Sequence, residues 1–432
     1  MRQTLVRLVA TVILAGCGVV ATGLAPLAAG PDDTWTPGAA LPERLNSPVF
    51  ALAVDPADGR RMLAGTDAGT IYLSPDGGAS WRPVRKGSGH GVLALAFDPA
   101  KPGTLLAGTR GGGIVRSADG GASWQAQPGS EARTVRAFAF LDGAALAATD
   151  QGLLSSRDGG PWSNAGLAHV RVSALTVVPA SGGAASGTVI AGGDATQGGE
   201  ALPLFSSADG GRTWAAVPVT NPAASGGVVG GSSMVAAVAG GPVPRQGALS
   251  LLVGTNTGLF GTTDQGATWR QLTGGGALPA TDVSSLAIAP RRADRLYVAS
   301  DGGGASQGGL WVSSDAGGHF ASLAPPVPGV TALAVSGDDA PTLLVATFRA
   351  ADHAVALWTY RDAGGQPRGP VAGAPPPGAV RPAQGGGRTG AGEAGWAALL
   401  QRPETPYLAI SALALALVAL AGVVHLRRER GR

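Results

Sequence analysis

The sequence predicts an all-β protein, a seven-bladed β-propeller with an N-terminal signal segment and a C-terminal single transmembrane helix. Three observations predict it. A short block of Ser/Thr, Asp, Gly and Trp recurs along the chain, three short apolar strand patterns precede each block, and long apolar segments occur only at the two ends. Four short strands per repeat, without helical periodicity between them, are typical of a propeller blade.

The composition permits a folded core but excludes several kinds of site. Of 432 residues, 44% are hydrophobic, while 71 Gly and 32 Pro suggest locally disordered segments. The single cysteine, Cys17, excludes a disulfide framework and a cysteine-based zinc cluster, and the five histidines are never at ligand spacing. We therefore expect no metal and no cofactor. The net charge of +3 is small for this length and does not favour nucleic acid as a partner.

Residues 1–30 are predicted to be a signal peptide or an N-terminal anchor. Arg2 and Arg7 precede an apolar stretch that ends in small residues at Ala29, which is the order of regions in an export signal. Within it, Leu14-Ala15-Gly16-Cys17 resembles the bacterial lipobox. Cys17 is then the candidate for lipidation, and the alternative is a chance cysteine in an apolar segment.

The other end of the chain predicts a membrane anchor. Residues 407–426 form an uninterrupted apolar segment of 20 residues, which as a helix spans about 30 Å, the thickness of the hydrocarbon core. The basic tail 427–432 is expected on the cytoplasmic side. Residues 363–402 are rich in Gly and Pro and predict a disordered linker. The predicted location is a single-pass protein of the cell membrane, with an extracytoplasmic propeller and a cytoplasmic C-terminus.

The recurring block sets the number of blades. Full copies occupy 74–81, 117–124, 207–214 and 262–269, weaker copies occupy 156–162 and 313–320, and a degenerate copy lies at 360–365. The aspartates of successive copies are separated by between 39 residues, from Asp119 to Asp158, and 55 residues, from Asp209 to Asp264. A period of this size means one supersecondary unit per repeat.

Each block completes a four-stranded unit. The first strand follows a Val-x-Ala-Leu-Ala pattern, the second ends in small residues, the third follows a glycine turn, and the fourth begins at the block's Trp. Residues 33–362 therefore form the predicted propeller. The seventh unit lacks its own fourth strand, and Thr34-Trp35 repeats the start of one. We expect this segment to pair beside Leu357-Trp358-Thr359, which closes the ring and removes an exposed sheet edge.

The block resembles the Asp-box, also called the bacterial neuraminidase repeat (BNR), and the resemblance covers about three quarters of the chain. Families with this repeat include sialidases, some endoglucanases, sortilin-type receptors and the photosystem II assembly factors. The resemblance implies a propeller fold and leaves the function open.

The Asp and the aromatic residue of each block are expected to be structural. An Asp in a tight turn accepts backbone hydrogen bonds, and the Trp buries a large surface between blades. These structural positions are Asp76, Trp81, Asp119, Trp124, Asp158, Trp162, Asp209, Trp214, Asp264, Trp269, Asp315 and Phe320.

Candidate ligand-binding residues lie on the opposite face, in the turns between second and third strands. These turns supply one polar residue per blade near the central opening: Asp67, Arg110, Asp150, Asp194, Asn256, Asp301 and Arg349. The loops that enter each blade add Arg44, His90, Glu131, Arg133, His169, Arg171 and Asp282. Loops converging on a rigid scaffold favour a binding site. The alternative is that exposed turns favour Asp and Asn on conformational grounds alone.

The sialidase resemblance implies an arginine triad that holds a carboxylate, a Tyr nucleophile paired with a Glu, and an Asp that acts as the acid/base. Asn46 stands where the first arginine of that family's motif would be, and no propeller Glu is paired in sequence with a suitable Tyr. No catalytic residue is assigned. A hydrolase with two catalytic aspartates would have Asp67, Asp150 and Asp301 as candidates.

Three functions follow as hypotheses. The first, which we favour, is a non-enzymatic, membrane-anchored binding or assembly module for a protein or glycan partner. The alternative is a glycoside hydrolase, either sialidase-like or endoglucanase-like. A purely structural envelope protein is the third.

Overall fold

The computed structural model describes residues 32–179, 187–195, 204–219, 235–241, 250–255, 258–264, 266–272, 278, 283–303 and 308–365. The chain divides into two compact units, Met1–Ala379 and Val380–Arg432, and every described residue belongs to the first. All regular structure in the described residues is β-strand.

The strands form seven four-stranded antiparallel sheets, which confirms the predicted seven-bladed β-propeller. Six blades are continuous in sequence. Blade 1 contains β2 (Ala51–Val54), β3 (Met62–Gly65), β4 (Ile71–Ser74) and β5 (Arg82–Arg85); blade 2 contains β6 (Val92–Phe97), β7 (Leu105–Thr109), β8 (Ile114–Ser117) and β9 (Gln125–Ala126); and blade 3 contains β10 (Val135–Leu141), β11 (Ala144–Thr149), β12 (Gly152–Arg157) and β13 (Ser163–Asn164). Blade 4 contains β14 (Val170–Val178), β15 (Thr188–Ala195), β16 (Leu204–Ser207) and β17 (Ala215–Ala216); blade 5 contains β18 (Val235–Gly240), β19 (Leu251–Thr255), β20 (Gly258–Thr262) and β21 (Arg270–Gln271); and blade 6 contains β22 (Val283–Ala289), β23 (Arg292–Ser300), β24 (Gly309–Ser313) and β25 (Ala321–Ser322).

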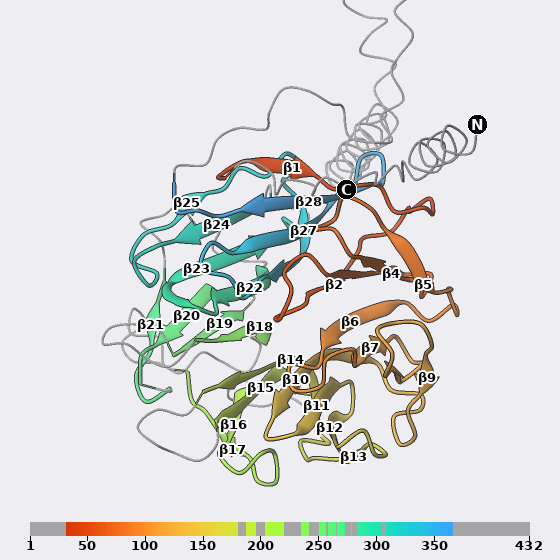
Figure 1. The fold of residues 1–432 in the computed structure, drawn as a ribbon. Helices are drawn as coiled ribbons and strands as arrows, with labels where there is room; N and C mark the ends of the chain where they lie inside the picture. The colour runs from red at the N-terminus through yellow and green to blue at the C-terminus, as the bar shows by residue number, and fades with distance from the viewer. Residues whose placement is uncertain are drawn as a thin grey trace, which may run out of the picture. The chain divides into compact units, whose positions relative to one another are not determined.

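Blade 7 joins the two ends of the propeller sequence. It contains β26 (Val330–Val335), β27 (Thr342–Arg349), β28 (Ala354–Arg361) and, as its outer strand, β1 (Trp35–Pro37). Trp35 pairs with Tyr360 and Pro37 with Trp358. The closing strand therefore lies where the sequence predicts it, and the two ends are held in one sheet (Figure 1).

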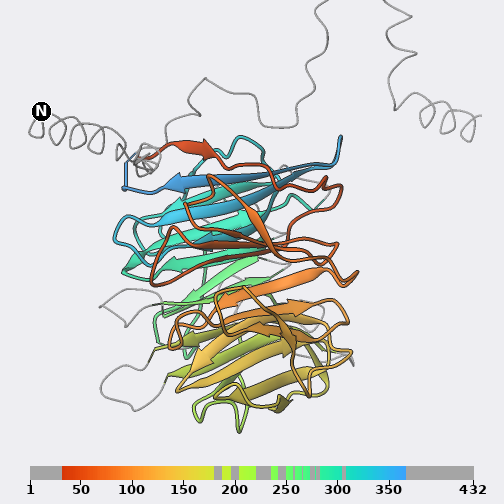
Figure 2. The same ribbon diagram turned by 45° about the vertical axis from the view of Figure 1, so that its right-hand side comes forward.

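The first strands of the blades contact one another in cyclic order, from β2 through β6, β10, β14, β18 and β22 to β26 and back to β2. Figure 1 shows the blades arranged around this inner ring, and Figure 2 shows their strands running across the thickness of the ring. The inner strands carry apolar residues on both faces because each sheet packs against a neighbour on either side.

Seven apolar clusters fill the seven interfaces between neighbouring blades. Six of these clusters contain ten to twelve buried residues each. The cluster between blades 2 and 3 contains only six, Leu106, Ile114, Val135, Ala147, Leu154 and Trp162. Burial between blades, rather than inside any one blade, is what stabilises the ring.

The small residues that end the second strands have a packing reason. A Cβ added at Gly65 would lie 2.4 Å from Cγ1 of Val92, the first residue of the next blade's inner strand. Gly108, Gly192 and Gly254 meet Val135, Val235 and Val283 in the same way. The valine of one blade thus fills the space that a side chain on the preceding blade would need.

Gly65→Ala is therefore expected to destabilise the protein by about 1–3 kcal/mol through overpacking, although Ala is normally preferred to Gly inside a strand. The measurement is chemical denaturation of the purified protein. The double variant Gly65→Ala/Val92→Ala makes room for the new methyl group, so the two effects should be less than additive. Strict additivity would show that the Gly65–Val92 contact does not cause the loss.

The predicted segments at 1–30, 407–426 and 427–432, with Cys17, lie outside the described residues, as do residues 366–402 of the predicted linker 363–402. Within the part of the chain that is described, no helix is long and apolar enough to cross a membrane.

Candidate functional site

The recurring block forms the turn between the third and fourth strands of a blade, and we call these turns, such as 74–81, the Asp-turns. The Asp carboxylate of such a turn is hydrogen-bonded by other residues of the same turn. Ser74 Oγ donates to Asp76 Oδ1 at 2.8 Å, and the Ser80 amide and hydroxyl donate to the two oxygens of the same carboxylate at 2.9 and 2.6 Å. Gly77 and Gly78 have φ values of 74° and 87°, a backbone region open to glycine. Equivalent bonds surround Asp119, Asp209, Asp264 and Asp315. These carboxylates are occupied within their turns.

Hydrogen bonding favours the charged form of these aspartates. Bonds from the hydroxyls of Thr262 and Thr268 lower the pKa of Asp264 to about 2, and the amide of His319 is the main cause that lowers the pKa of Asp315 to about 2. The unfolded pKa of Asp is about 3.9. Since the folded pKa is depressed, the stabilisation is present above about pH 4 and is lost as the pH falls towards 2.

We expect the urea midpoint of the protein to fall between pH 5 and pH 3, because protonation of these carboxylates favours the unfolded state. Replacing Asp264 by Asn should flatten this dependence, since the amide cannot titrate. A midpoint that stays constant or rises on acidification would contradict the assignment.

The aromatic residues of the blocks lie between blades. Trp81, Trp162, Trp269 and Phe320 are buried, and Trp124 and Trp214 are partly buried.

Asp158 is the exception among the aspartates of the Asp-turns. In its turn, which is one residue short, Ser156 Oγ donates to the carbonyl of Gly160, and Asp158 instead pairs with Lys101 of blade 2 at 3.2 Å.

Four of the seven predicted turn residues form ion pairs on the face opposite the Asp-turns. Arg110 pairs with Asp67 of the neighbouring blade at 3.1 Å. Asp194 pairs with Arg171 at 3.3 Å across β14 and β15. Arg349 forms a two-point bond to Asp352 within its own turn, at 2.8 and 2.6 Å. The structure thus brings Asp67 and Arg110 together, and both are already engaged.

The other predicted residues of this set are placed separately. Asp150 Oδ1 accepts the amide of Thr134 at 3.0 Å, and Asp301 Oδ1 accepts the amide of Gly303 at 3.1 Å. Asn256 lies outside the described residues, as does Asp282 of the second set. Of that second set, Arg133 donates to the carbonyl of Gln151, and His90 bonds the carbonyl of Arg110. Most of these polar side chains fix loops.

A Tyr–Glu pair that the sequence does not predict lies on blade 1. Glu43 accepts a hydrogen bond from Thr70 Oγ1 at 3.1 Å and interacts with Tyr72. Tyr72 is 3% exposed, and burial together with the negative charge of Glu43 raises its pKa to about 12. A tyrosine nucleophile needs an accessible phenol with a lowered pKa. This pair has neither property.

A ring of equivalent positions lines the start of the inner strands, and sequence reasoning missed it. In six blades the pairing of first and second strands shifts register just after the leading valine, at the x position of the Val-x-Ala pattern. The seven x residues are Phe50, Leu93, Arg136, Ser173, Ala236, Ser284 and Thr331. Their variation within a regular pattern is the signal that could have identified them.

On one side of this ring the x residues connect blades. Ser173 Oγ donates to the carbonyl of Val235 at 2.7 Å, Ser284 Oγ to that of Val330 at 2.8 Å, and Thr331 Oγ1 to that of Val49 at 2.7 Å. Each bond runs from one inner strand to the leading valine of the next blade. These three hydroxyls are therefore structural.

On the other side, three consecutive blades present side chains that cannot make this bond or do not make it. Phe50 of blade 1 is 44% exposed and is the large apolar residue most open to solvent in the described part of the chain. Leu93 of blade 2 is partly exposed and Arg136 of blade 3 is exposed. No ion pair or hydrogen bond joins the Arg136 guanidinium to another described residue. We call Phe50, Leu93 and Arg136 the mouth arc.

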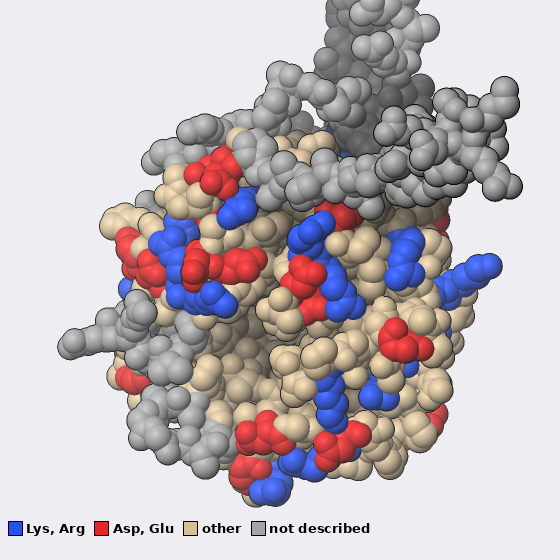
Figure 3. Space-filling model, in the orientation of Figure 1, with Lys and Arg blue, Asp and Glu red and all other residues tan. Residues whose placement is uncertain are grey.

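Around the ring, acidic and basic side chains are mixed rather than segregated. Figure 3 shows Lys and Arg interspersed with Asp and Glu on one face, around a central hollow whose visible lining is uncharged. A mixed surface does not favour a polyanion such as nucleic acid.

No protein-family model matches the sequence, and no curated protein matches it. Among solved structures, the GH74 xyloglucanase from Xanthomonas campestris superposes with a TM-score of 0.54 at 20% identity, over 77% of this chain and 54% of the enzyme. The shared feature is the propeller fold. The extracellular domain of a one component system from B. thetaiotaomicron gives 0.51 at 13% identity, over 75% of this chain and 39% of that one. YCF48 from Cyanidioschyzon merolae superposes with a TM-score of 0.49 at 15% identity, over 76% of this chain and 98% of YCF48.

The chain thus spans about half the length of the xyloglucanase that it resembles in fold. The propeller fold occurs both in an enzyme and in the extracellular domain of a one component system. Because a fold does not fix an activity, function has to be argued from the residues of the site.

Proposed function

We propose that this protein is a non-enzymatic binding module, and that the mouth arc holds an extended segment of a partner protein carrying an acidic side chain. The observation that carries the proposal is the combination of an exposed phenylalanine, a partly exposed leucine and an arginine without a partner among the described residues, on three adjacent blades. Aromatic residues and Arg are the types most enriched at the centres of protein interfaces.

The three aspartates considered for hydrolysis have contacts within the loops. Asp67 is paired with Arg110, while Asp150 and Asp301 each accept a loop amide through Oδ1. A partner segment could instead lie over the arc while these pairs stay intact.

Membrane attachment through 407–426 and an extracytoplasmic propeller are part of the same proposal and rest on the sequence pattern. A Gly/Pro-rich tether of about 40 residues has a root-mean-square reach of about 35 Å. Such a tether would let the propeller search for a partner near the membrane surface.

The test is recovery of a partner by the full-length protein from its own cells. We expect a protein that co-purifies with the wild type to be lost with Phe50→Ala/Arg136→Glu. It should be retained with Arg212→Glu, a change at an exposed position on an Asp-turn. Equal recovery by both variants would remove the mouth arc as the binding site.

Glycoside hydrolysis is the second candidate, because the xyloglucanase shares the fold. A fluorogenic sialoside and xyloglucan, assayed with the wild type and with Asp150→Asn, distinguish the two. Turnover that depends on Asp150 would replace the binding proposal, and we expect none.

A further inference from the structure

The interface between blades 2 and 3 departs in two places from a contact that three other interfaces share. In those three, an aliphatic residue three positions after the block's Trp packs on the Asp-turn of the next blade. Val84 lies against Gly121, Val217 against Gly266, and Leu272 against Gly317. In blade 2 this position is Gln127, and the turn that it faces is the short one, 156–162.

At these two departures the interface between blades 2 and 3 contains a cavity with a mixed polar and apolar wall. A cavity of about 20 Å³ lies between the blades, and an adjoining hollow of about 120 Å³ shares Asp98, Lys101 and Gly143 with it. The interface also has the smallest apolar cluster of the ring, although residues 84–165 are all described. The polarity is therefore a property of this interface.

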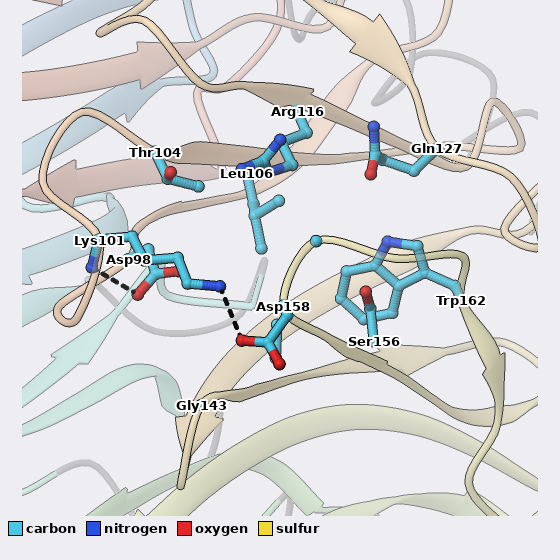
Figure 4. Close-up of a pocket in the computed structure, with 12 residues that line it drawn as sticks. Asp98, Lys101, Thr104, Leu106, Arg116, Gln127, Gly143, Ser156, Asp158 and Trp162 are labelled. Carbon is cyan, nitrogen blue, oxygen red and sulfur yellow. Dashed lines mark hydrogen bonds and ion pairs between the residues drawn. The ribbon is translucent and has the colours of Figure 1, made fainter.

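The cavity wall is built from buried polar side chains. Gln127 is 9% exposed, and Thr104 and Ser156 are also buried. Figure 4 shows Gln127 and Arg116 reaching the gap from blade 2, with Ser156, Asp158 and Trp162 on the blade 3 side. Ser156 Oγ donates to the Gly160 carbonyl and Gln127 Nε2 to the Gln125 carbonyl, so the second amide hydrogen of Gln127 remains as a donor for an occupant.

One cation in this cavity has no anionic partner among the described residues. Lys101 pairs with Asp158, and Asp98 Oδ1 accepts the amides of Ala100 and Lys101. The partly buried Arg116 lies over Gly159 without a hydrogen bond or ion pair to another described residue. Asp142 and Arg157 are the other charged groups nearby, and Arg157 donates to the Asp142 carbonyl.

We propose that this cavity binds a short aliphatic carboxylate. The planar guanidinium of Arg116 matches a carboxylate with two parallel hydrogen bonds, and the second amide hydrogen of Gln127 supplies a further donor. The adjoining hollow, lined in part by Pro99, Phe140 and Leu141, accommodates a short apolar tail. This site is separate from the mouth arc and does not depend on the function proposed for it.

The test is ligand-observed NMR of propionate with the full-length protein. We expect saturable binding with a dissociation constant on the order of 1–10 mM, as is usual for a ligand of a few atoms. Arg116→Gln should weaken binding at least about tenfold, the loss expected when one charged hydrogen-bonded pair is removed. The matched control Arg212→Gln should leave binding unchanged, and propionamide, which lacks the charge, should bind far more weakly.

Gln127→Leu is the second variant. It restores the aliphatic residue found at this position in blades 5 and 6, so it is expected to fold, to fill the cavity and to abolish propionate binding. Absence of saturable binding to the wild type would overturn the proposal and leave the cavity to water. Propionate binding that survives Gln127→Leu, or phosphate binding more tightly than propionate, would overturn it as well.

Discussion

Asp362→Ala is expected to lower the free energy of unfolding by about 3–5 kcal/mol, because it leaves a buried arginine without its counter-charge. The Asp362 carboxylate is fully buried and accepts Arg295 Nε and the Tyr297 hydroxyl, each at 2.6 Å. Arg295 Nη2 bonds its second oxygen. Burial and the charge of Asp362 raise the pKa of Tyr297, so its hydroxyl remains a donor.

Two comparisons make this result specific. Asp158→Ala, in the equivalent turn of blade 3, breaks an exposed pair and should cost no more than about 1 kcal/mol. Replacing the whole cluster by Arg295→Met, Tyr297→Phe and Asp362→Leu should recover most of the loss, since no buried charge then remains. A loss below about 1 kcal/mol for Asp362→Ala would show that the cluster is not what holds blades 6 and 7 together.

Trp35→Ala is expected to cost about 3–5 kcal/mol, the usual range for truncating a buried tryptophan. Trp35 is 2% exposed, packs on Tyr360 with ring centroids 5.0 Å apart, and donates to the carbonyl of Leu323 at 2.7 Å. It therefore joins the closing strand β1 both to blade 7 and to blade 6. Denaturation by guanidinium, followed by tryptophan fluorescence, measures the change.

Thr36→Ala is the matched control, because Thr36 lies in the same strand and is only partly buried. We expect its effect to be within about 0.5 kcal/mol. If Trp35→Ala were equally mild, the closing strand would not contribute to the stability of the ring.

The fold follows from the sequence because a propeller repeats one local solution. The period-two strands, the glycine turns and the buried tryptophans each specify one blade. The missing fourth strand of blade 7 leaves Thr34-Trp35 as its complement, and the observed pairing of Trp35 with Tyr360 agrees. Local patterns sufficed here since each strand pairs within a short stretch of sequence, apart from this single closure.

The site was harder to predict because it depends on contacts between residues far apart in sequence, both between blades and between a loop and its blade. The pairing of Asp67 with Arg110 and the approach of Glu43 to Tyr72 join residues 43 and 29 positions apart. Nothing in the residue types indicates these partners. Asp362 belongs to the degenerate last copy of the block, and nothing in that copy predicts a buried ion pair. In the closed ring, however, Asp362 lies beside Arg295, which is 67 positions earlier in the sequence.

The mouth arc shows a different limit. Phe50, Leu93 and Arg136 occupy a position whose residue type differs between repeats. From the sequence pattern alone, such a position is interpreted as one that tolerates any residue. The hydroxyl bonds of Ser173, Ser284 and Thr331 reveal that this position sits at the seam between inner strands. The large side chains at positions without this bond, Phe50, Leu93 and Arg136, are the ones that we propose contact a partner.

Photo-crosslinking from single positions tests the binding account most directly. A photoreactive phenylalanine analogue is placed at position 50 in the mouth arc and, in a separate protein, at position 212 on an Asp-turn, each in the full-length chain in its own cells. The account predicts one discrete crosslinked partner from position 50, lost when Arg136 is changed to Glu, and none from position 212. Equal crosslinking from both positions, or a product at position 50 that is indifferent to Arg136, would contradict it.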